Sequence, residues 1–148
     1  MTAVGSYRPD WDPESPSRTQ IRLIDVRRAY FNGLIDKLDK PTFVDVPSED
    51  PDDAEQCGQL LRRIYGTRGA ADGWQEECST TLVRHGFKQG KACLNFFYHP
   101  IRALATSVHG DDFTSSGSKM QLDWFEAMVA EEYEIAVGAS IKSLHPII

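Results

Sequence analysis

Two adjacent aspartates, Asp111 and Asp112, separate the apolar run Leu104 to His109 from the short segment Phe113 to Ser115. Strand-like segments on both sides of so short a polar break predict an antiparallel hairpin with both carboxylates at its tip. Adjacent carboxylates repel each other, and Mg²⁺ would offset that repulsion because it prefers hard oxygen ligands. On turn statistics alone, an acidic solvated turn is the simpler explanation.

The other segments alternate between strand and helix signals. Gln20 to Val26 places apolar Ile21 and Leu23 between polar neighbours, which predicts a strand that ends near Asp25. Two helices are expected, and Ser118 is expected to cap the N-terminus of the second. The order of elements predicts an α+β domain, an antiparallel sheet with helices packed on one face. The predicted strands are Gln20 to Val26, Thr42 to Val46, Ala92 to His99, Leu104 to His109 and Phe113 to Ser115, and the predicted helices are Ala70 to His85 and Ser118 to Tyr133.

A length of 148 residues, with 41% hydrophobic and 26% charged side chains, suits one globular domain. Tyr7 to Ser17 holds three prolines among acids and serines, too little apolar surface to order by itself. We therefore expect a flexible tail over residues 1–17 and one domain over residues 18–148.

Charge and cysteine usage exclude several classes of protein. The net charge of −6 does not provide the broad basic surface of a self-sufficient nucleic-acid binder. Three distant cysteines without a CxxC pair indicate neither a disulfide framework nor a thiolate zinc site. There is no apolar run long enough to cross a bilayer and no signal peptide at the N-terminus. We expect an intracellular protein, cytoplasmic or nuclear, that is neither secreted nor bound to a membrane.

Asp25 supplies a third carboxylate at the end of another predicted strand. Neighbouring strands would bring it together with Asp111 and Asp112. Two metal ions about 4 Å apart, bridged by carboxylates, can activate an attacking oxygen and stabilise a leaving phosphate oxygen. The three acids therefore indicate polymerase or nuclease chemistry.

Four stretches of the chain together resemble the reverse transcriptases of copia-type LTR retrotransposons. They are IDVRRAYFNG from Ile24, RRIYGTRGAADGW from Arg62, LVRHGF from Leu82 and VHGDDF from Val108. Their order and the 86 positions from Asp25 to Asp111 also resemble that family. The resemblance implies a polymerase palm with partial fingers and RNA-directed DNA synthesis by two-metal nucleotidyl transfer. It also implies Mg²⁺, with Mn²⁺ as a substitute, and an RNA or DNA template-primer and a deoxynucleoside triphosphate as partners.

The resemblance assigns roles to the three acids and to one aromatic residue. Asp25 and Asp111 would be the principal metal ligands, and Asp112 the third carboxylate. Tyr30 matches the aromatic residue that lies under the incoming sugar and excludes a 2′-hydroxyl. By itself, Tyr30 would be read as a core tyrosine. Strand alternation would let His109 share the face of Asp111, but imidazole is a poor magnesium ligand, so a structural role is expected for it.

The resemblance also assigns Gly66, Arg68 and Gly69 to a turn on the nucleotide side, where backbone approaches the substrate and a cation meets phosphate. Arg68 alone would be an ordinary solvated arginine. Seven arginines near these motifs fit phosphate contacts and equally fit side chains that cover apolar edges while their heads stay in water. They are Arg18, Arg22, Arg27, Arg28, Arg62, Arg63 and Arg68.

Two functions follow from these observations. The first is a palm-region fragment of a retrotransposon polymerase, a truncated domain of a transposable element that is weakly active or inactive by itself. The second is a non-enzymatic α+β remnant that acts, if at all, through protein contacts. A metal-dependent nuclease is a lesser alternative, because no histidine or lysine is clearly placed as general base.

Overall fold

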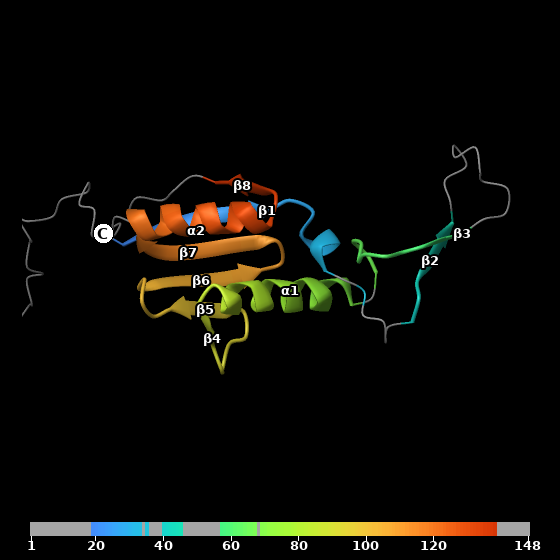
Figure 1. The fold of residues 1–148 in the computed structure, drawn as a ribbon, viewed down its shortest axis with the longest axis horizontal. Helices are drawn as coiled ribbons and strands as arrows, with labels where there is room; N and C mark the ends of the chain where they lie inside the picture. The colour runs from blue at the N-terminus through green and yellow to red at the C-terminus, as the bar shows by residue number, and fades with distance from the viewer. Residues whose placement is uncertain (1–18, 34, 36–39, 46–56, 68, 139–148) are drawn as a thin grey trace, which may run out of the picture.

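In the computed structural model, which describes residues 19–33, 35, 40–45, 57–67 and 69–138, strands and helices build one antiparallel sheet and a small ribbon. The six-stranded sheet has the order β4-β5-β6-β7-β1-β8, and each neighbouring pair is antiparallel. A two-stranded ribbon, β2-β3, lies apart from it (Figure 1). The elements are β1 (Thr19–Val26), η1 (Ala29–Asn32), β2 (Phe43–Asp45), β3 (Cys57–Gln59), α1 (Ala70–Arg84), β4 (Lys88–Gln89), β5 (Phe96–His99), β6 (Leu104–His109), β7 (Asp112–Ser118), α2 (Lys119–Glu132) and β8 (Ile135–Val137).

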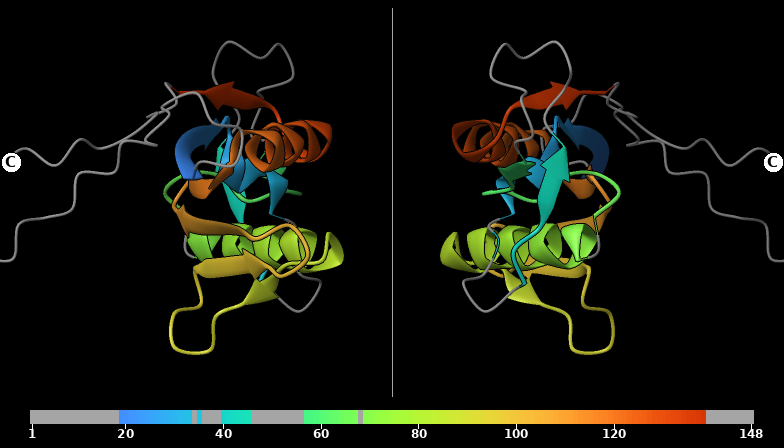
Figure 2. Two further views of the ribbon diagram at one scale, coloured as in Figure 1. Left: turned by 90° about the vertical axis from the view of Figure 1, so that its left-hand side faces the viewer. Right: turned by 90° about the vertical axis from the view of Figure 1, so that its right-hand side faces the viewer.

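Both helices cover the same face of the sheet, and no helix of the described residues covers the other face. Figure 1 shows α1 and α2 in front of the strands, and Figure 2 shows β8 at one edge and β4 and β5 at the other. Burial alternates along β6 and β7, so that one set of side chains faces the helices and the next faces outward. The prediction of an α+β domain with helices on one face of an antiparallel sheet is confirmed. The predicted tail, residues 1–17, lies outside the described residues.

The core lies between this face and the two helices. From α1 it receives Trp74, Cys78 and Leu82, at intervals of four residues. From α2 it receives Leu122, Phe125, Met128 and Val129. Inside the sheet, the buried hydroxyls of Thr106 and Ser115 pair at 2.8 Å across β6 and β7, so neither is left without a partner. One continuous core therefore holds together elements that lie far apart in the sequence.

Three sequence predictions need correction. The strand expected from Ala92 starts only at Phe96, because the Gly90 amide donates to the Phe96 carbonyl at 2.8 Å and closes a turn. The strand expected to end at Ser115 continues to Ser118, since it pairs with both β1 and β6. Ser118 stands at the N-cap of α2, but its side chain makes no capping hydrogen bond. Strand β4 was not predicted.

The inner face of β1 carries two polar side chains. Gln20, Arg22, Ile24 and Val26 face the core, whereas Leu23 is 40% exposed. Of the inner residues, Arg22 is the charged one.

The Arg22 side chain is only 8% exposed, and its two terminal nitrogens donate to Asp123 and Glu126 of α2, each at 2.8 Å. A phosphate-binding role for Arg22 is therefore wrong, because its guanidinium joins the sheet to α2. Hydrogen bonds from Lys119 and Arg22 lower the pKa of the Asp123 carboxyl.

We expect Arg22→Met to lower the free energy of unfolding by about 2 kcal/mol, because two charge-assisted hydrogen bonds at a buried side chain are lost. Chemical denaturation at pH 7 measures this. Lys119→Met is the control: its exposed pair with the same Asp123 contributes at most about 0.5 kcal/mol. Equal losses in the two variants would contradict the role given to Arg22.

The same contact predicts a pH dependence. Since the folded pKa of Asp123 is lowered, its contribution is fully present above the unfolded value of about 3.9 and is lost as the pH falls through the folded pKa. The stability of Arg22→Met should therefore fall less steeply than that of the wild type below about pH 4. Parallel acid curves would contradict this assignment.

Candidate metal centre

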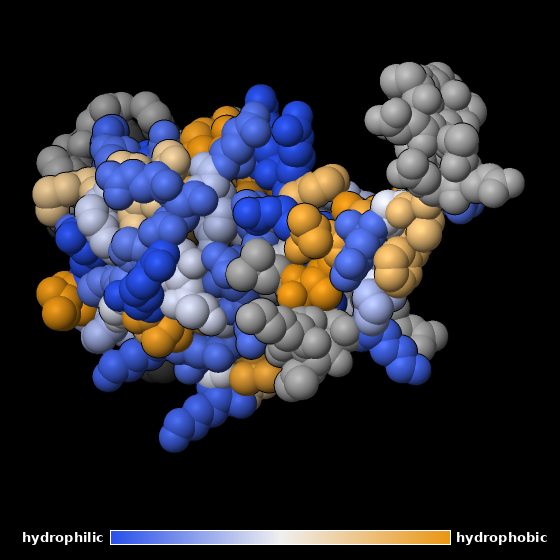
Figure 3. All heavy atoms as spheres, turned by 45° about the vertical axis from the view of Figure 1, so that its right-hand side comes forward, coloured by the Kyte–Doolittle hydropathy of each residue, from blue (hydrophilic) through white to orange (hydrophobic). Residues whose placement is uncertain are grey.

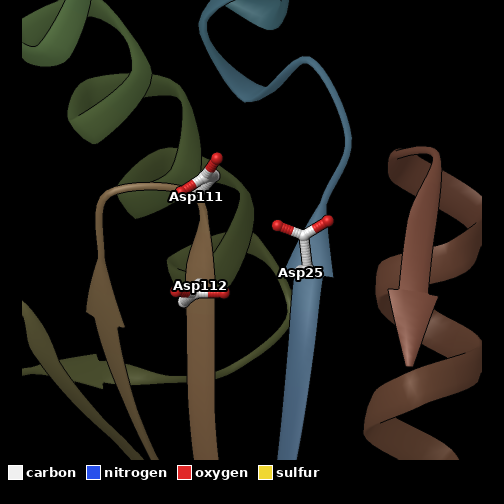
Figure 4. Close-up of side chains that lie close together, drawn as sticks. All are labelled: Asp25, Asp111 and Asp112. Atoms are coloured by element: carbon white, nitrogen blue, oxygen red, sulfur yellow. The ribbon is translucent and has the colours of Figure 1, made fainter. Parts of the chain in front are cut away.

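Three carboxylates meet at one end of the six-stranded sheet. Asp25 of β1 lies directly opposite Asp112 of β7, and Asp111 occupies the turn between β6 and β7. One ligand oxygen from each residue lies within 4.8 Å of the others. Figure 4 shows the three side chains side by side, on two adjacent strands and the neighbouring turn. The expected convergence of Asp25, Asp111 and Asp112 is thus found, and none of them is buried.

Local backbone geometry explains the tightness of this turn. Gly110 has φ +59°, in the left-handed region that glycine adopts without strain. The Val26 amide of β1 donates to the Asp111 carbonyl at 2.8 Å, and the Trp74 indole of α1 donates to the Gly110 carbonyl at 2.6 Å. The turn is therefore tied to both β1 and α1.

The donor set suits a hard divalent cation. It consists of carboxylate oxygens alone, which Mg²⁺ and Mn²⁺ accept well. Among the described residues, no ion pair with an arginine, lysine or histidine neutralises the trio. Three mutually repelling, accessible carboxylates fit a site that a cation would stabilise.

Tyr30 and Tyr65 border the carboxylates. Tyr30, on η1, packs partly against the core, and its hydroxyl lies 3.9 Å from the position that a Cβ on Gly110 would take. Its ring meets Tyr65 edge-on at 4.5 Å between centroids. The pKa of Tyr65 is raised, first by burial and then by the charges of Asp111 and Asp25. Sequence reasoning missed Tyr65, although it stands beside the predicted Gly66 turn.

The turn expected on the nucleotide side contains two glycines with positive φ. Gly66 has φ +82° and Gly69 has φ +79°, a conformation that other residues rarely adopt. Gly69 also stands at the N-cap of α1. Arg68 lies outside the described residues.

A cavity of about 300 Å³ adjoins this turn. Among the described residues, its lining contains three cationic side chains and no acidic one, which suits an anionic ligand. The Arg63 guanidinium donates to the Gly69 carbonyl at 2.8 Å, and that of Arg62 to the Phe31 carbonyl at 3.2 Å. The lining residues are Ile35, Lys40, Thr42, Leu60, Arg62, Arg63, Thr67 and Gly69.

Two further residues that the sequence singled out, Arg27 and His109, lie outside the cavity lining and the carboxylate cluster. Arg27 pairs with Glu134 at 3.1 Å, so, like Arg22, it is held by an acid away from the cavity lining. His109 lies opposite Asp112 in the strand register and shares its face of the sheet, but it does not belong to the carboxylate cluster.

Exposed apolar side chains gather beyond the site, around η1 and the β2-β3 ribbon (Figure 3). They are Phe31, Phe43, Val44, Leu61 and Tyr65.

An antiparallel sheet with helices on one face and acids at the tips of two adjacent strands defines a polymerase palm-like domain. Residues 16–147 match the reverse transcriptase (RNA-dependent DNA polymerase) family, and the chain belongs to that family. None of the curated proteins compared with the chain is significantly similar to it. Within the described part of the chain, no helix has the length and apolar character required to span a membrane.

Close packing between Gly33 and α1 generates a prediction about the stability of the fold. A Cβ on Gly33 would lie 3.0 Å from the Gly73 carbonyl carbon and 3.1 Å from the Trp74 nitrogen. We expect Gly33→Ala to push η1 away from α1 and to lower the free energy of unfolding by about 1 to 3 kcal/mol.

Urea denaturation measures this effect, with Gly58→Ala as the control. A Cβ on Gly58 meets Val44 only at 3.8 Å, so that variant should change by less than about 0.5 kcal/mol. A Gly33→Ala chain as stable as the wild type would show that η1 and α1 do not need this approach.

Proposed function

We propose that this chain is the palm of a copia-type LTR retrotransposon polymerase, in which Asp25, Asp111 and Asp112 hold two divalent metal ions for nucleotidyl transfer. The observation that carries the proposal is the meeting of one oxygen from each carboxylate within 4.8 Å, in a chain of the reverse transcriptase family. Mg²⁺ is the proposed ion and Mn²⁺ a working substitute. The proposed substrates are an RNA or DNA template with its primer and a deoxynucleoside triphosphate.

The proposed reaction joins the primer 3′-oxygen to the α-phosphorus of the nucleotide. That bond forms as the bond from the α-phosphorus to the bridging oxygen breaks, pyrophosphate leaves, and the 3′-hydroxyl proton passes to solvent. Bound metal ions would lower the pKa of the 3′-hydroxyl and stabilise the charge on the leaving oxygen. Asp25 and Asp111 would hold both ions, with Asp112 as the third carboxylate, at an accessible sheet end that a primer terminus can reach.

The neighbouring residues support binding of the nucleotide. Tyr30 is proposed to lie under the sugar and exclude a 2′-hydroxyl, which agrees with its place beside the Gly110 turn. Gly66, Arg68 and Gly69 are proposed to approach the triphosphate. The cationic cavity beside Gly69 supports that proposal, because Arg62 and Arg63 line it. The role of Arg68 rests on the sequence resemblance alone.

A non-enzymatic role through protein contacts is the second candidate. The observation that favours it is the exposed β2-β3 ribbon, where Phe43 is 56% exposed and the nearby Leu61 is 79% exposed. Apolar side chains gathered on a surface mark interaction sites in many soluble proteins. Carboxylates that bind no metal would favour this candidate.

We predict that millimolar Mg²⁺ or Mn²⁺ raises the thermal midpoint of the chain by several degrees, because a cation relieves repulsion among three clustered acids. Calorimetry with and without metal measures the shift. Asp111→Asn should remove most of it, whereas Glu131→Gln, which changes an exposed acid outside the trio, should retain it. An unchanged wild-type midpoint would mean that no useful metal site forms.

We also predict that the chain extends a primer weakly and without processivity. Holding the primer end and nucleotide together contributes roughly 7 to 11 kcal/mol in such reactions. The net charge is −6, and Arg22 and Arg27 are bound to acids, so the described part of the chain offers little positive surface to hold a duplex.

Primer extension on a homopolymer template with Mg²⁺ or Mn²⁺ tests this prediction. Any extension should disappear in Asp111→Asn and persist in Glu131→Gln. Robust, processive synthesis that Asp111→Asn abolishes would contradict the prediction and make the chain a minimal polymerase.

A further inference from the structure

Both peptide groups that flank Asp111 are tied to other parts of the fold. The peptide before it is held through the Gly110 carbonyl, which accepts from the Trp74 indole at 2.6 Å. The peptide after it is held through the Asp111 carbonyl, which accepts from the Val26 amide at 2.8 Å. One tie comes from α1 and the other from β1.

These two ties fix the direction of the bond from Cα to Cβ of Asp111, and so the position from which its carboxylate extends. The orientation of the preceding peptide plane sets φ of Asp111, and that of the following plane sets ψ. With both planes held, the bond from Cα to Cβ can point in only one direction. This matters because three carboxylates repel one another, and a turn held on one side only could open to separate them.

Trp74 is itself well fixed. It is 2% exposed, and its ring meets that of Tyr133 edge-on at 5.1 Å between centroids. Tyr133 in turn reaches Glu77, one helical turn along α1, at 3.4 Å. The indole nitrogen therefore holds the turn from a rigid part of the core.

We propose that Trp74 is a positioning residue, whose indole N–H orients Asp111 for cation binding through the Gly110 carbonyl. The inference rests on the proposed function, since it requires that the carboxylates bind a metal ion. It assigns to Trp74 a task that its hydrophobic packing alone would not perform. A phenylalanine in its place would keep most of the packing and lose the hydrogen bond.

The test is the affinity of the full chain for Mn²⁺ alone, measured by electron paramagnetic resonance and calorimetry. Trp74→Phe should bind Mn²⁺ about three- to tenfold more weakly than the wild type, the worth of one hydrogen bond. Trp124→Phe is the matched control: Trp124 lies on α2, stacks on Phe87 and lies beneath the Arg102 guanidinium, away from the turn. It should leave the affinity unchanged. Circular dichroism at the same temperature establishes that each variant is folded.

If Trp74→Phe does not fold, a subtler replacement keeps the test decisive. In a chain with the other two tryptophans changed to phenylalanine, position 74 carries either tryptophan or its benzothiophene analogue, in which sulfur replaces the N–H. The analogue should show the same three- to tenfold loss. Unchanged Mn²⁺ affinity in either pair would overturn the positioning role while leaving the metal site intact. A wild-type chain that binds no Mn²⁺ would overturn the proposed function, and this inference with it.

Discussion

The pairing of β1 with β7 is the interaction on which the candidate site depends. Its register sets Asp25 directly opposite Asp112 and leaves Asp111 in the adjoining turn. A slip of one residue would turn every side chain of β1 to the other face, which would send Asp25 inward and Arg22 outward. The acid cluster and the ion pairs of Arg22 thus require the same register.

Arg22 stabilises this register from the core side of β1. It donates to both Asp123 and Glu126, so β1 and α2 are joined by charge as well as by apolar packing. An outward-facing Arg22 would leave those acids without this partner. Both helices lie on the face that Arg22 enters, so among the described elements no helix covers the face of Asp25 and Asp112.

Much of the fold followed from short-range patterns, and the errors have physical causes. The hairpin at Asp111 and the helix from Ala70 were predictable because apolar spacing and glycine turns are local signals. The orientation of β1 was not, since Ile21 and Leu23 on one face compete with Ile24 and Val26 on the other. Acids about a hundred positions away on α2 resolve that ambiguity.

The candidate site was likewise predictable only in part. The three carboxylates could be grouped from their positions at strand ends, but Tyr65 and the indole of Trp74 could not. Their roles depend on how η1 and α1 pack beside the turn, and no local pattern in the sequence reports that packing.

The central claim is that Asp25, Asp111 and Asp112 together hold two metal ions. A crystal of the chain soaked in Mn²⁺, with diffraction recorded at the manganese absorption edge, tests it most directly. The account predicts two anomalous peaks about 4 Å apart, bridged by carboxylates of this trio. Well-ordered carboxylates with no peak within bonding distance of them would contradict it.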